Sequence, residues 1–266
     1  MILGMNDLTA LAEGLMPVAA QAGEAIMKIY DAGFEVQRKQ DNSPLTLADL
    51  ESQRIIMDAL KRLTPGIPIL SEESAAAPWE QRRHWRELWV VDPLDGTREF
   101  VKRNGEFTVN IALVRNHEPV FGIITAPAKG LCYWGAAGVG AFSEHLRSER
   151  VRIHTIAPPS PLRVIGSRSH ASNQTAAFLT KLAPHVVSGM GSSLKFCLIA
   201  EGKADLYPRF GPTSEWDTAA GQALLEAAGG QVTRFDGHRL RYNCRESLIN
   251  GNFIAFSTPA VLPAMG

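Results

Sequence analysis

Two aspartates at the end of an apolar segment are the residues of this sequence best suited to binding a metal ion. The segment reads WVVDPLDGTREF (89–100), and Asp92 and Asp95 follow its apolar residues. Sites tend to form where strands end at one edge of a sheet, and Pro93 and Gly96 predict a tight turn there. Two carboxylates in one turn repel each other unless a cation lies between them. Carboxylate oxygens are hard ligands, which favours Mg²⁺ or Mn²⁺ over zinc.

Three further acidic groups lie at the ends of expected elements. Glu72 and Glu73 follow the apolar run IPIL, Asp217 begins an expected helix, and Asp49 lies just inside a helix that begins at Thr46. Each has a structural explanation when taken singly. Asp217 is a candidate N-cap, Asp49 fits a capping box with Thr46, and the glutamates fit a solvated loop. Together with the aspartate pair, the four groups favour a site for more than one metal ion.

A site with two metal ions would suit phosphate chemistry. Two metals roughly 3.5–4 Å apart clamp a phosphate, lower the pKa of a bound water and stabilise the leaving oxygen. Thr97 follows Asp95 and Gly96 closely, so its hydroxyl is a candidate for orienting that water, and Asp49 is a candidate acceptor of its proton. The helix that begins at Asp217 could direct its positive end toward the phosphate. We therefore expect hydrolysis of a phosphate monoester on a small metabolite.

The composition is that of an ordinary globular protein. The 266 residues are 45% hydrophobic and 20% charged. A chain of this length can bury a sizeable core without disulfides or structural metals. Lys and Arg number 27, as do Asp and Glu, and this zero net charge argues against nucleic acid as a partner. The three cysteines form no CxxC pair, which favours a reducing cytoplasm over disulfides or a zinc site. We expect a cytoplasmic protein without an integral membrane segment, because there is no basic leader and no long apolar run.

The expected elements change in character along the chain. Apolar residues recur at helical spacing over 7–30, and a second helix runs from Thr46 to the Thr-Pro-Gly at 64–66. The first half then reads mainly as strands, and the second half alternates strands with helices. The expected strands are 34–39, 67–70, 88–91, 107–114, 120–125, 162–167, 186–189, 204–208, 231–234 and 253–256. The expected later helices are 171–183, 192–203 and 217–228.

At its acidic residues the sequence resembles the inositol monophosphatase family of metal-dependent, lithium-sensitive phosphatases. DPLDGT and WDTAAG are the two motifs of that family and stand here in order, with SEE and the Asp49 helix upstream. The resemblance runs over roughly residues 8 to 256. It implies an α/β fold, a layered αβαβα sandwich of the inositol monophosphatase/fructose-1,6-bisphosphatase type. It also implies an α+β metal-binding half (1–155) and an α/β substrate-binding half (156–266) in one catalytic unit.

A narrower resemblance points to the bacterial 3′(2′),5′-bisphosphate nucleotidases of the CysQ type, which act in sulfur metabolism. It is carried by DNSPLTLAD, NGEFTVNIAL, SRSH, GSSLKFCLIAEGKADLYPRFGPT and EWDTAAG. SRSH and GSSLKF distinguish this branch from inositol phosphatases. The resemblance implies hydrolysis of adenosine 3′,5′-bisphosphate to AMP and phosphate. Some relatives in this branch are placed at the inner face of the membrane, for which this sequence offers no anchor.

The resemblance also implies a role for each residue that matches a motif. Two or three Mg²⁺ ions would be bound by Glu72, Asp92, Asp95, Asp217 and the carbonyl oxygen of Leu94. Mn²⁺ would be able to replace Mg²⁺, and Li⁺ would inhibit the enzyme. Thr97 and Asp49 would activate the attacking water. The turn formed by Leu94, Asp95, Gly96 and Thr97 would also cradle the scissile phosphate, and Glu72 and Asp217 would be further substrate-binding residues. The role of Glu73 stays open.

Four residues of the second half would hold the adenosine 5′-phosphate part: His170, Ser192, Lys195 and Arg209. The chemistry of Lys195 and Arg209 supports this role independently of the resemblance. Both can neutralise a second phosphate, and Arg can do so with two hydrogen bonds. The ordinary explanation for Lys195 is an exposed helix charge, and for His170 a surface histidine. The SRSH context is what favours a binding role for His170.

Several alternatives stay open at this point. An inositol or sugar monophosphatase of the same family would share the metal site and differ within 162–212. A haloacid-dehalogenase type phosphatase needs DxDx[TV], whereas these aspartates are three residues apart. A catalytically silent nucleotide-binding regulator would more naturally lack Asp49, Thr97 or a metal carboxylate, and all are present. The oligomeric state and the preference between the 5′-phosphate and 5′-phosphosulfate forms are not readable.

Overall fold

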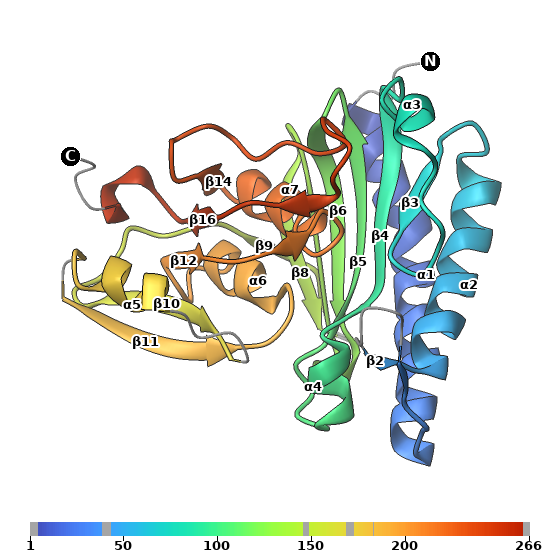
Figure 1. Cartoon of the computed structure of the whole chain (residues 1–266), viewed down its shortest axis with the longest axis horizontal. Helices are drawn as coiled ribbons and strands as arrows, with labels where there is room; N and C mark the ends of the chain where they lie inside the picture. The colour runs from blue at the N-terminus through green and yellow to red at the C-terminus, as the bar shows by residue number, and fades with distance from the viewer. Residues whose placement is uncertain (1–4, 39–43, 146–148, 169–172, 183, 263–266) are drawn as a thin grey trace.

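Two sheets separated by a pair of helices form the body of the molecule. The computed structural model describes residues 5–38, 44–145, 149–168, 173–182 and 184–262. From right to left, Figure 1 shows two long helices, a first sheet, α6 and α7, a second sheet and finally α5. This is the αβαβα sandwich that the sequence predicts, and the predicted fold class is confirmed.

The first sheet has seven strands that are neighbours in chain order. Its β3 and β4 are parallel, and every later pair is antiparallel. The strands are β3 (Ile69–Ser71), β4 (Glu87–Asp95), β5 (Thr108–Arg115), β6 (Glu118–Ala126), β7 (Leu131–Ala136), β8 (Gly140–His145) and β9 (Val151–Ile153). Carboxyl and amino ends alternate along each edge from β4 onward, whereas the carboxyl ends of β3 and β4 lie at the same edge.

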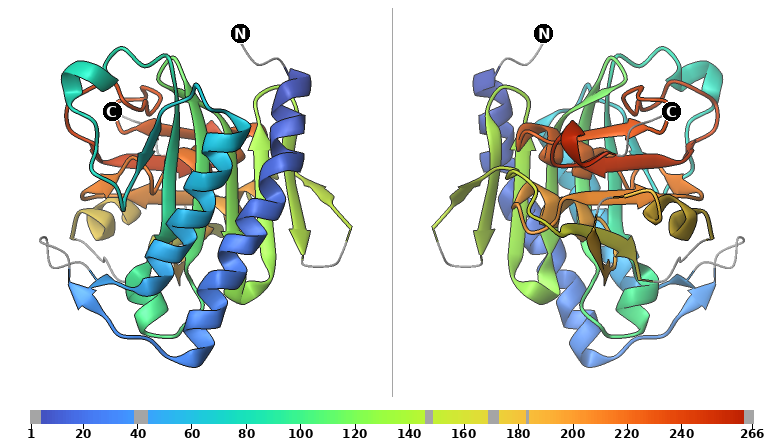
Figure 2. Two further views of the ribbon diagram at one scale, coloured as in Figure 1. Left: turned by 90° about the vertical axis from the view of Figure 1, so that its right-hand side faces the viewer. Right: turned by 90° about the vertical axis from the view of Figure 1, so that its left-hand side faces the viewer.

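Two amphipathic helices cover one face of this sheet, α1 (Met5–Ala32) and α2 (Leu47–Leu63). Figure 2 (left) shows them side by side across the strands. Their buried side chains, such as Leu15, Ile26 and Ile56, join those of the strands in one apolar cluster. Burial of such stripes is the main stabilising contribution to helices of this kind.

The opposite face of the first sheet receives α7 (Ala219–Ala227) at close range. A Cβ atom added at Gly122 of β6 would lie 2.5 Å from the carbonyl oxygen of Ala220. One added at Gly135 of β7 would lie 2.8 Å from the Cα atom of Leu224. The two glycines therefore allow the helix backbone to lie directly on the sheet.

The second sheet has the strand order β11-β10-β12-β16-β14 and lies beyond α7 and α6 (Leu194–Ala200). Its strands are β10 (Leu162–Ser167), β11 (His185–Met190), β12 (Leu206–Arg209), β14 (Gln231–Arg234) and β16 (Phe253–Phe256). The outer face carries α5 (Asn173–Leu179) and the 3₁₀ turn η2 (Pro259–Val261), which pack through Phe178 and Val261.

Short elements complete the described chain. They are β1 (Gln37–Arg38), β2 (Pro44–Leu45), α3 (Trp79–Arg82), α4 (Thr97–Val101), η1 (Pro127–Lys129), β13 (Thr213–Ser214) and β15 (Ile249–Asn250). The first sheet ends at Ile153 and the second begins at Leu162. The division into halves near residue 155 stays a prediction, because α7 from the second half packs directly on the first sheet. Within the described ranges, no helix has the length and apolar character needed to cross a membrane.

Several predicted boundaries are wrong, and two of them concern the acidic residues. The strand predicted at 88–91 extends through Asp95 as β4, with an irregular register between Asp92 and Asp95. Pro93, predicted in the turn, therefore lies inside β4, whereas Gly96 does turn the backbone, with a φ of +89°. The helix predicted to begin at Asp217 begins at Ala219 instead. β4 pairs with β5, and the segment Thr213–Ser214 before α7 pairs with β15, neither of which local pattern reveals.

Candidate metal and phosphate site

A cleft opens between the end of β4, the loop before α6 and the loop before α7. Its wall contains most of the residues that the sequence singled out. They are Glu72, Asp92, Leu94, Asp95, Gly96, Thr97, Ser192, Lys195, Arg209 and Asp217. The predicted Asp49 lies behind Thr97, and His170 is outside the described residues. The fold thus gathers side chains from both halves of the chain at one place.

Three carboxylates come together on one side of the cleft. Glu72 follows β3, Asp92 lies in β4 and Asp217 precedes α7, and one carboxylate oxygen of each lies within 4.8 Å of the others. Burial, followed by repulsion from neighbouring carboxylates, raises the pKa of Asp92 and of Asp217 well above its ordinary value. The trio is therefore an unfavourable arrangement without a compensating positive charge.

The hydrogen bonds of this trio leave room for a cation. Oδ1 of Asp92 accepts from the backbone N–H of Leu94 at 3.0 Å, whereas its buried Oδ2 has no hydrogen-bond partner in the described part of the chain. Oδ2 of Asp217 accepts from the backbone N–H of Ser214 at 2.9 Å. A buried carboxylate with one unpartnered oxygen, close to two further carboxylates, fits a hard divalent ion such as Mg²⁺.

Asp95 does not belong to the close trio of carboxylates among the described residues. Its Oδ2 accepts from the backbone N–H of Ser193 at 2.6 Å and lies 3.4 Å from the side-chain nitrogen of Asn110. Burial raises the pKa of Asp95 to about 6, although Lys195 and the Ser193 N–H oppose this rise. Asp95 therefore connects the metal side of the cleft with the loop before α6. Its assignment as a metal ligand stays a prediction.

Thr97 and Asp49 lie together at the edge of the cleft. The Thr97 hydroxyl lies 3.4 Å from Oδ1 of Asp49 and 3.3 Å from the carbonyl oxygen of Leu94. The other oxygen of Asp49, Oδ2, accepts from both the N–H and the hydroxyl of Thr46 at 2.7 Å. The capping box is therefore real, and it orients Asp49 toward Thr97 as well.

The same cleft also has two cationic side chains, Lys195 and Arg209. Lys195 is buried, its ammonium group lies 5.1 Å from the ring centroid of Tyr207, and it donates to the carbonyl oxygen of Ser192. The explanation of Lys195 as an exposed helix charge is thus wrong. Burial lowers the pKa of Lys195 to about 8, with a smaller opposing effect from Asp95. Nearby, Nε of Arg209 donates to the Thr213 hydroxyl at 2.9 Å.

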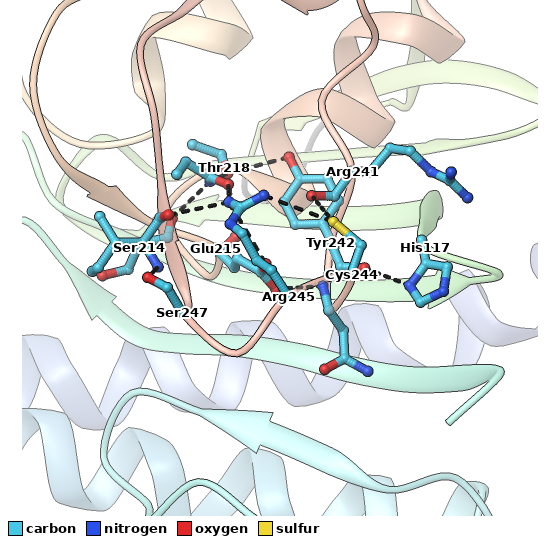
Figure 3. Close-up of polar contacts among 12 residues, drawn as sticks. His117, Ser214, Glu215, Thr218, Arg241, Tyr242, Cys244, Arg245 and Ser247 are labelled. Atoms are coloured by element: carbon cyan, nitrogen blue, oxygen red, sulfur yellow. Dashed lines mark hydrogen bonds and ion pairs between the residues drawn. The ribbon is translucent and has the colours of Figure 1, made fainter. Parts of the chain in front are cut away.

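A buried polar network supports the segment around Asp217 (Figure 3). Glu215 is completely buried, and its Oε2 accepts from the backbone N–H of Asn243 at 2.8 Å. The Tyr242 hydroxyl lies 3.2 Å from the hydroxyl of Thr218. The residues on both sides of Asp217 are therefore held by the loop between β14 and β16. Sequence reasoning missed this support, because nothing within the loop marks it as a partner of WDTAAG.

Comparison of the sequence with known proteins gives two concordant matches. Residues 7–260 match the profile of the inositol monophosphatase family. The 3′(2′),5′-bisphosphate nucleotidase CysQ of Salmonella typhimurium is 48% identical over 243 residues, covering 91% of this chain and 97% of the relative.

Solved structures agree with this comparison. The crystal structure of CysQ from Bacteroides thetaiotaomicron, a bacterial member of the inositol monophosphatase family, has a TM-score of 0.82 and 40% identity. It covers 93% of this chain and 97% of its own. Inositol monophosphatase from Anabaena has a TM-score of 0.72 and 29% identity, covering 94% and 92%.

Proposed function

Because the chain belongs to the inositol monophosphatase family, we propose that it is a Mg²⁺-dependent 3′(2′),5′-bisphosphate nucleotidase. It is a phosphoric monoester hydrolase, and its proposed reaction converts adenosine 3′,5′-bisphosphate to AMP and phosphate. One observation carries the choice of substrate: the carboxylate trio and two cationic side chains, Lys195 and Arg209, line the same cleft. A substrate with two phosphates can engage both sides at once.

Glu72, Asp92 and Asp217 would hold the metal, together with Asp95 and the carbonyl oxygen of Leu94. When bound, Mg²⁺ would neutralise charge on the scissile phosphate and make a bound water more acidic. Two features support metal binding: all the proposed ligand atoms are oxygens, and Oδ2 of Asp92 has no hydrogen-bond partner among the described residues. The same carboxylates would exclude a phosphate from the cleft in the absence of a cation, because like charges repel.

Thr97 and Asp49 would orient the attacking water and take its proton. When the Thr97 hydroxyl donates to Oδ1 of Asp49, the lone pairs of its oxygen can accept a hydrogen bond from water. Proton transfer from that water to Thr97, with the Thr97 proton passing to Asp49, leaves hydroxide to attack phosphorus. The two hydrogen bonds from Thr46 keep Oδ2 of Asp49 in place during this transfer.

The 5′-phosphate would bind at Ser192, Lys195 and Arg209. The Arg209 guanidinium is held by hydrogen bonds to the Thr213 hydroxyl and the Pro212 carbonyl oxygen, both at 2.9 Å. A held guanidinium loses little conformational entropy when it binds phosphate. Lys195 adds a charge in a buried place, where its attraction to phosphate is weakly screened.

A comparison of substrates tests the proposal. Phosphate release would be measured with adenosine 3′,5′-bisphosphate and with inositol 1-phosphate, each with Mg²⁺ and with EDTA. We expect Mg²⁺-dependent release and a kcat/KM at least tenfold higher for the bisphosphate. Faster release from inositol 1-phosphate would support the sugar phosphatase instead. Binding of the bisphosphate without turnover in Mg²⁺ would point to a regulator and contradict the proposal.

A further inference from the structure

Glu106, in the connection before β5, joins the first half of the chain to two separate segments of the second. Its carboxylate accepts from Nε and Nη2 of Arg168, both at 2.7 Å, and its Oε2 also accepts from the backbone N–H of Gly191 at 2.8 Å. Arg168 follows β10 and donates in turn to the carbonyl oxygen of Gly189 in β11. The contact thus bridges the SRSH and GSSLKF segments through one buried carboxylate.

The loop Gly191–Ser193 is anchored to the first half at both of its ends. Glu106 holds the N–H of Gly191, and Asp95 holds the N–H of Ser193 at 2.6 Å. The Ser193 hydroxyl also donates to the side-chain oxygen of Asn110 at 2.7 Å. Ser192, between these anchors, lines the cleft and has a φ of +46°. A non-glycine residue keeps such a conformation only when its surroundings impose it.

Packing leaves this loop little freedom to move toward the metal side. A Cβ atom added at Gly191 would lie 2.7 Å from the carbonyl oxygen of Glu106 and 2.8 Å from Cγ of Glu99. Lys195 depends on the same loop, because its ammonium group donates to the carbonyl oxygens of Ser192 and Met190. A shift of the loop would therefore move Ser192 and Lys195 together, relative to the carboxylates.

We propose that the Glu106–Arg168 pair determines specificity by fixing the distance between the two phosphate-binding sides of the cleft. The pair holds Ser192 and Lys195 where a 5′-phosphate lies when the 3′-phosphate is at the carboxylate trio. Both members are positioning residues that act through the Gly191–Ser193 loop. The inference rests on the proposed nucleotidase function and adds to it the residues that set the spacing of the two phosphates.

At the reacting centre, Asp95 is tied to the loop through the N–H of Ser193, but the hydrogen bonds of Thr97 and Asp92 described above do not involve the pair. Thr97 and Asp49 bond to each other, and Asp92 bonds to the N–H of Leu94. Loss of the pair should therefore weaken recognition of the second phosphate more than the reaction at the first. The quantity that separates these effects is the ratio of kcat/KM for adenosine 3′,5′-bisphosphate to kcat/KM for 3′-AMP, which lacks the 5′-phosphate.

The test uses Glu106→Gln, Arg168→Met and the double variant Glu106→Gln/Arg168→Met. We expect each single variant to lower that ratio at least tenfold, mainly through a higher KM for the bisphosphate. The double variant should lower it no further, since the two residues act through one contact. Inhibition by the product AMP should weaken in parallel, because AMP keeps the 5′-phosphate. Arg168 is about half exposed, so its variant keeps the test valid if Glu106→Gln folds poorly.

A matched control removes a similar ion pair elsewhere on the first sheet. Glu87→Gln removes the negative charge from the 2.7 Å contact between Glu87 and Nε of Arg115, and neither residue lines the cleft. Its ratio should stay within about twofold of the unmodified chain. Equal losses on both substrates, or an unchanged ratio in Arg168→Met, would overturn the inference while leaving the nucleotidase proposal intact. Failure of the unmodified chain to hydrolyse the bisphosphate would instead overturn the function itself, and with it this inference.

Discussion

The hydroxyl of Thr97 lies 3.4 Å from Oδ1 of Asp49, a residue 48 positions earlier in the chain. Asp49 is at the same time the capping-box residue of α2, with Oδ2 held by the backbone and side chain of Thr46. One carboxylate thus serves the start of a helix with one oxygen and the cleft with the other. The stability of α2 and the chemistry at Thr97 are linked through this side chain.

Substitution of Asp49 should separate these two roles. Asp49→Asn removes the proton acceptor, so we expect kcat for phosphate release to fall roughly 10²–10⁴-fold, the usual contribution of general base catalysis. Thr46→Ala removes the cap and should cost about 0.5–2 kcal/mol in the free energy of unfolding, with a much smaller loss of kcat. Steady-state kinetics and urea denaturation measure both. Near-normal kcat in Asp49→Asn would contradict its proposed role.

Removal of one charge from the trio should make the metal-free protein more stable. Asp92→Asn keeps the acceptor for the Leu94 N–H but ends the repulsion and burial cost that raise the pKa of Asp92. We expect its melting temperature in EDTA at pH 8 to rise by about 2 °C or more, which corresponds to roughly 1 kcal/mol in a domain of this size.

Mg²⁺ should stabilise the unmodified chain much more than it stabilises Asp92→Asn. A ligand at 100 times its Kd stabilises the folded state by about 2.7 kcal/mol, so the unmodified chain should melt at a higher temperature in saturating Mg²⁺. Asp92→Asn should lose most of that gain and should release phosphate at least about 10²-fold more slowly. Thermal melting in EDTA and over a Mg²⁺ titration makes the measurement. An undiminished Mg²⁺ response in the variant would remove Asp92 from the metal site.

Arg209 and Lys195 should matter more for a substrate with two phosphates than for one. Truncating a charge-assisted contact to phosphate costs about 1.5–3 kcal/mol, which corresponds to roughly 10- to 150-fold in kcat/KM. We expect Arg209→Ala to show this loss with adenosine 3′,5′-bisphosphate and a several-fold smaller one with 3′-AMP. Equal losses on the two substrates would exclude Arg209 from the recognition of the second phosphate.

The contribution of Glu106 to stability should depend on pH. Burial would raise the pKa of Glu106, but hydrogen bonds from Arg168 and Gly191 outweigh this, and the pKa lies below its usual range. A carboxyl group with a lowered pKa in the folded state stabilises the protein above its unfolded pKa, about 4.3, and loses that contribution as the pH falls further. The difference in unfolding free energy between the unmodified chain and Glu106→Gln should therefore shrink below about pH 4.3. Denaturant titrations at pH 7 and in acid compare the two, and a pH-independent difference would contradict the ion pair.

Close packing between β6 and α7 should make the folded state sensitive to a side chain at Gly122. Gly122→Ala places a Cβ atom 2.5 Å from the carbonyl oxygen of Ala220, so we expect a loss of about 1–3 kcal/mol or more in the free energy of unfolding. Gly66→Ala is the matched control, since a Cβ atom there would meet no atom of the described residues within 4 Å, apart from its chain neighbours. Urea denaturation of both variants gives the comparison. A Gly122→Ala protein as stable as the control would contradict the close approach of α7.

Much of the fold could be predicted from local patterns. Apolar residues at helical spacing located α1, Thr46 and Asp49 located the start of α2, and the strands 231–234 and 253–256 coincide with β14 and β16. The predicted family is also confirmed. These successes share a cause, because caps and periodic burial depend on residues a few positions apart.

Element boundaries near the cleft were harder to predict. β4 continues through Asp92 to Asp95 because β5 supplies partners for its backbone. α7 begins only at Ala219, after a segment that pairs with β15 and a local turn in which Asp217 accepts from the N–H of Ser214. The partners in β5 and β15 are not visible in the local pattern. The sequence therefore located the acidic residues correctly but misjudged the backbone that carries them.

The sequence by itself determined which residues could bind a metal and two phosphates, since their types and their places at the ends of elements are local properties. Only the tertiary structure decided how the two sides of the cleft are joined. Asp95 meets the N–H of Ser193 across 98 positions, and Glu106 meets that of Gly191 across 85. Such contacts arise when two sheets pack on shared helices, and no periodicity along the chain records that packing.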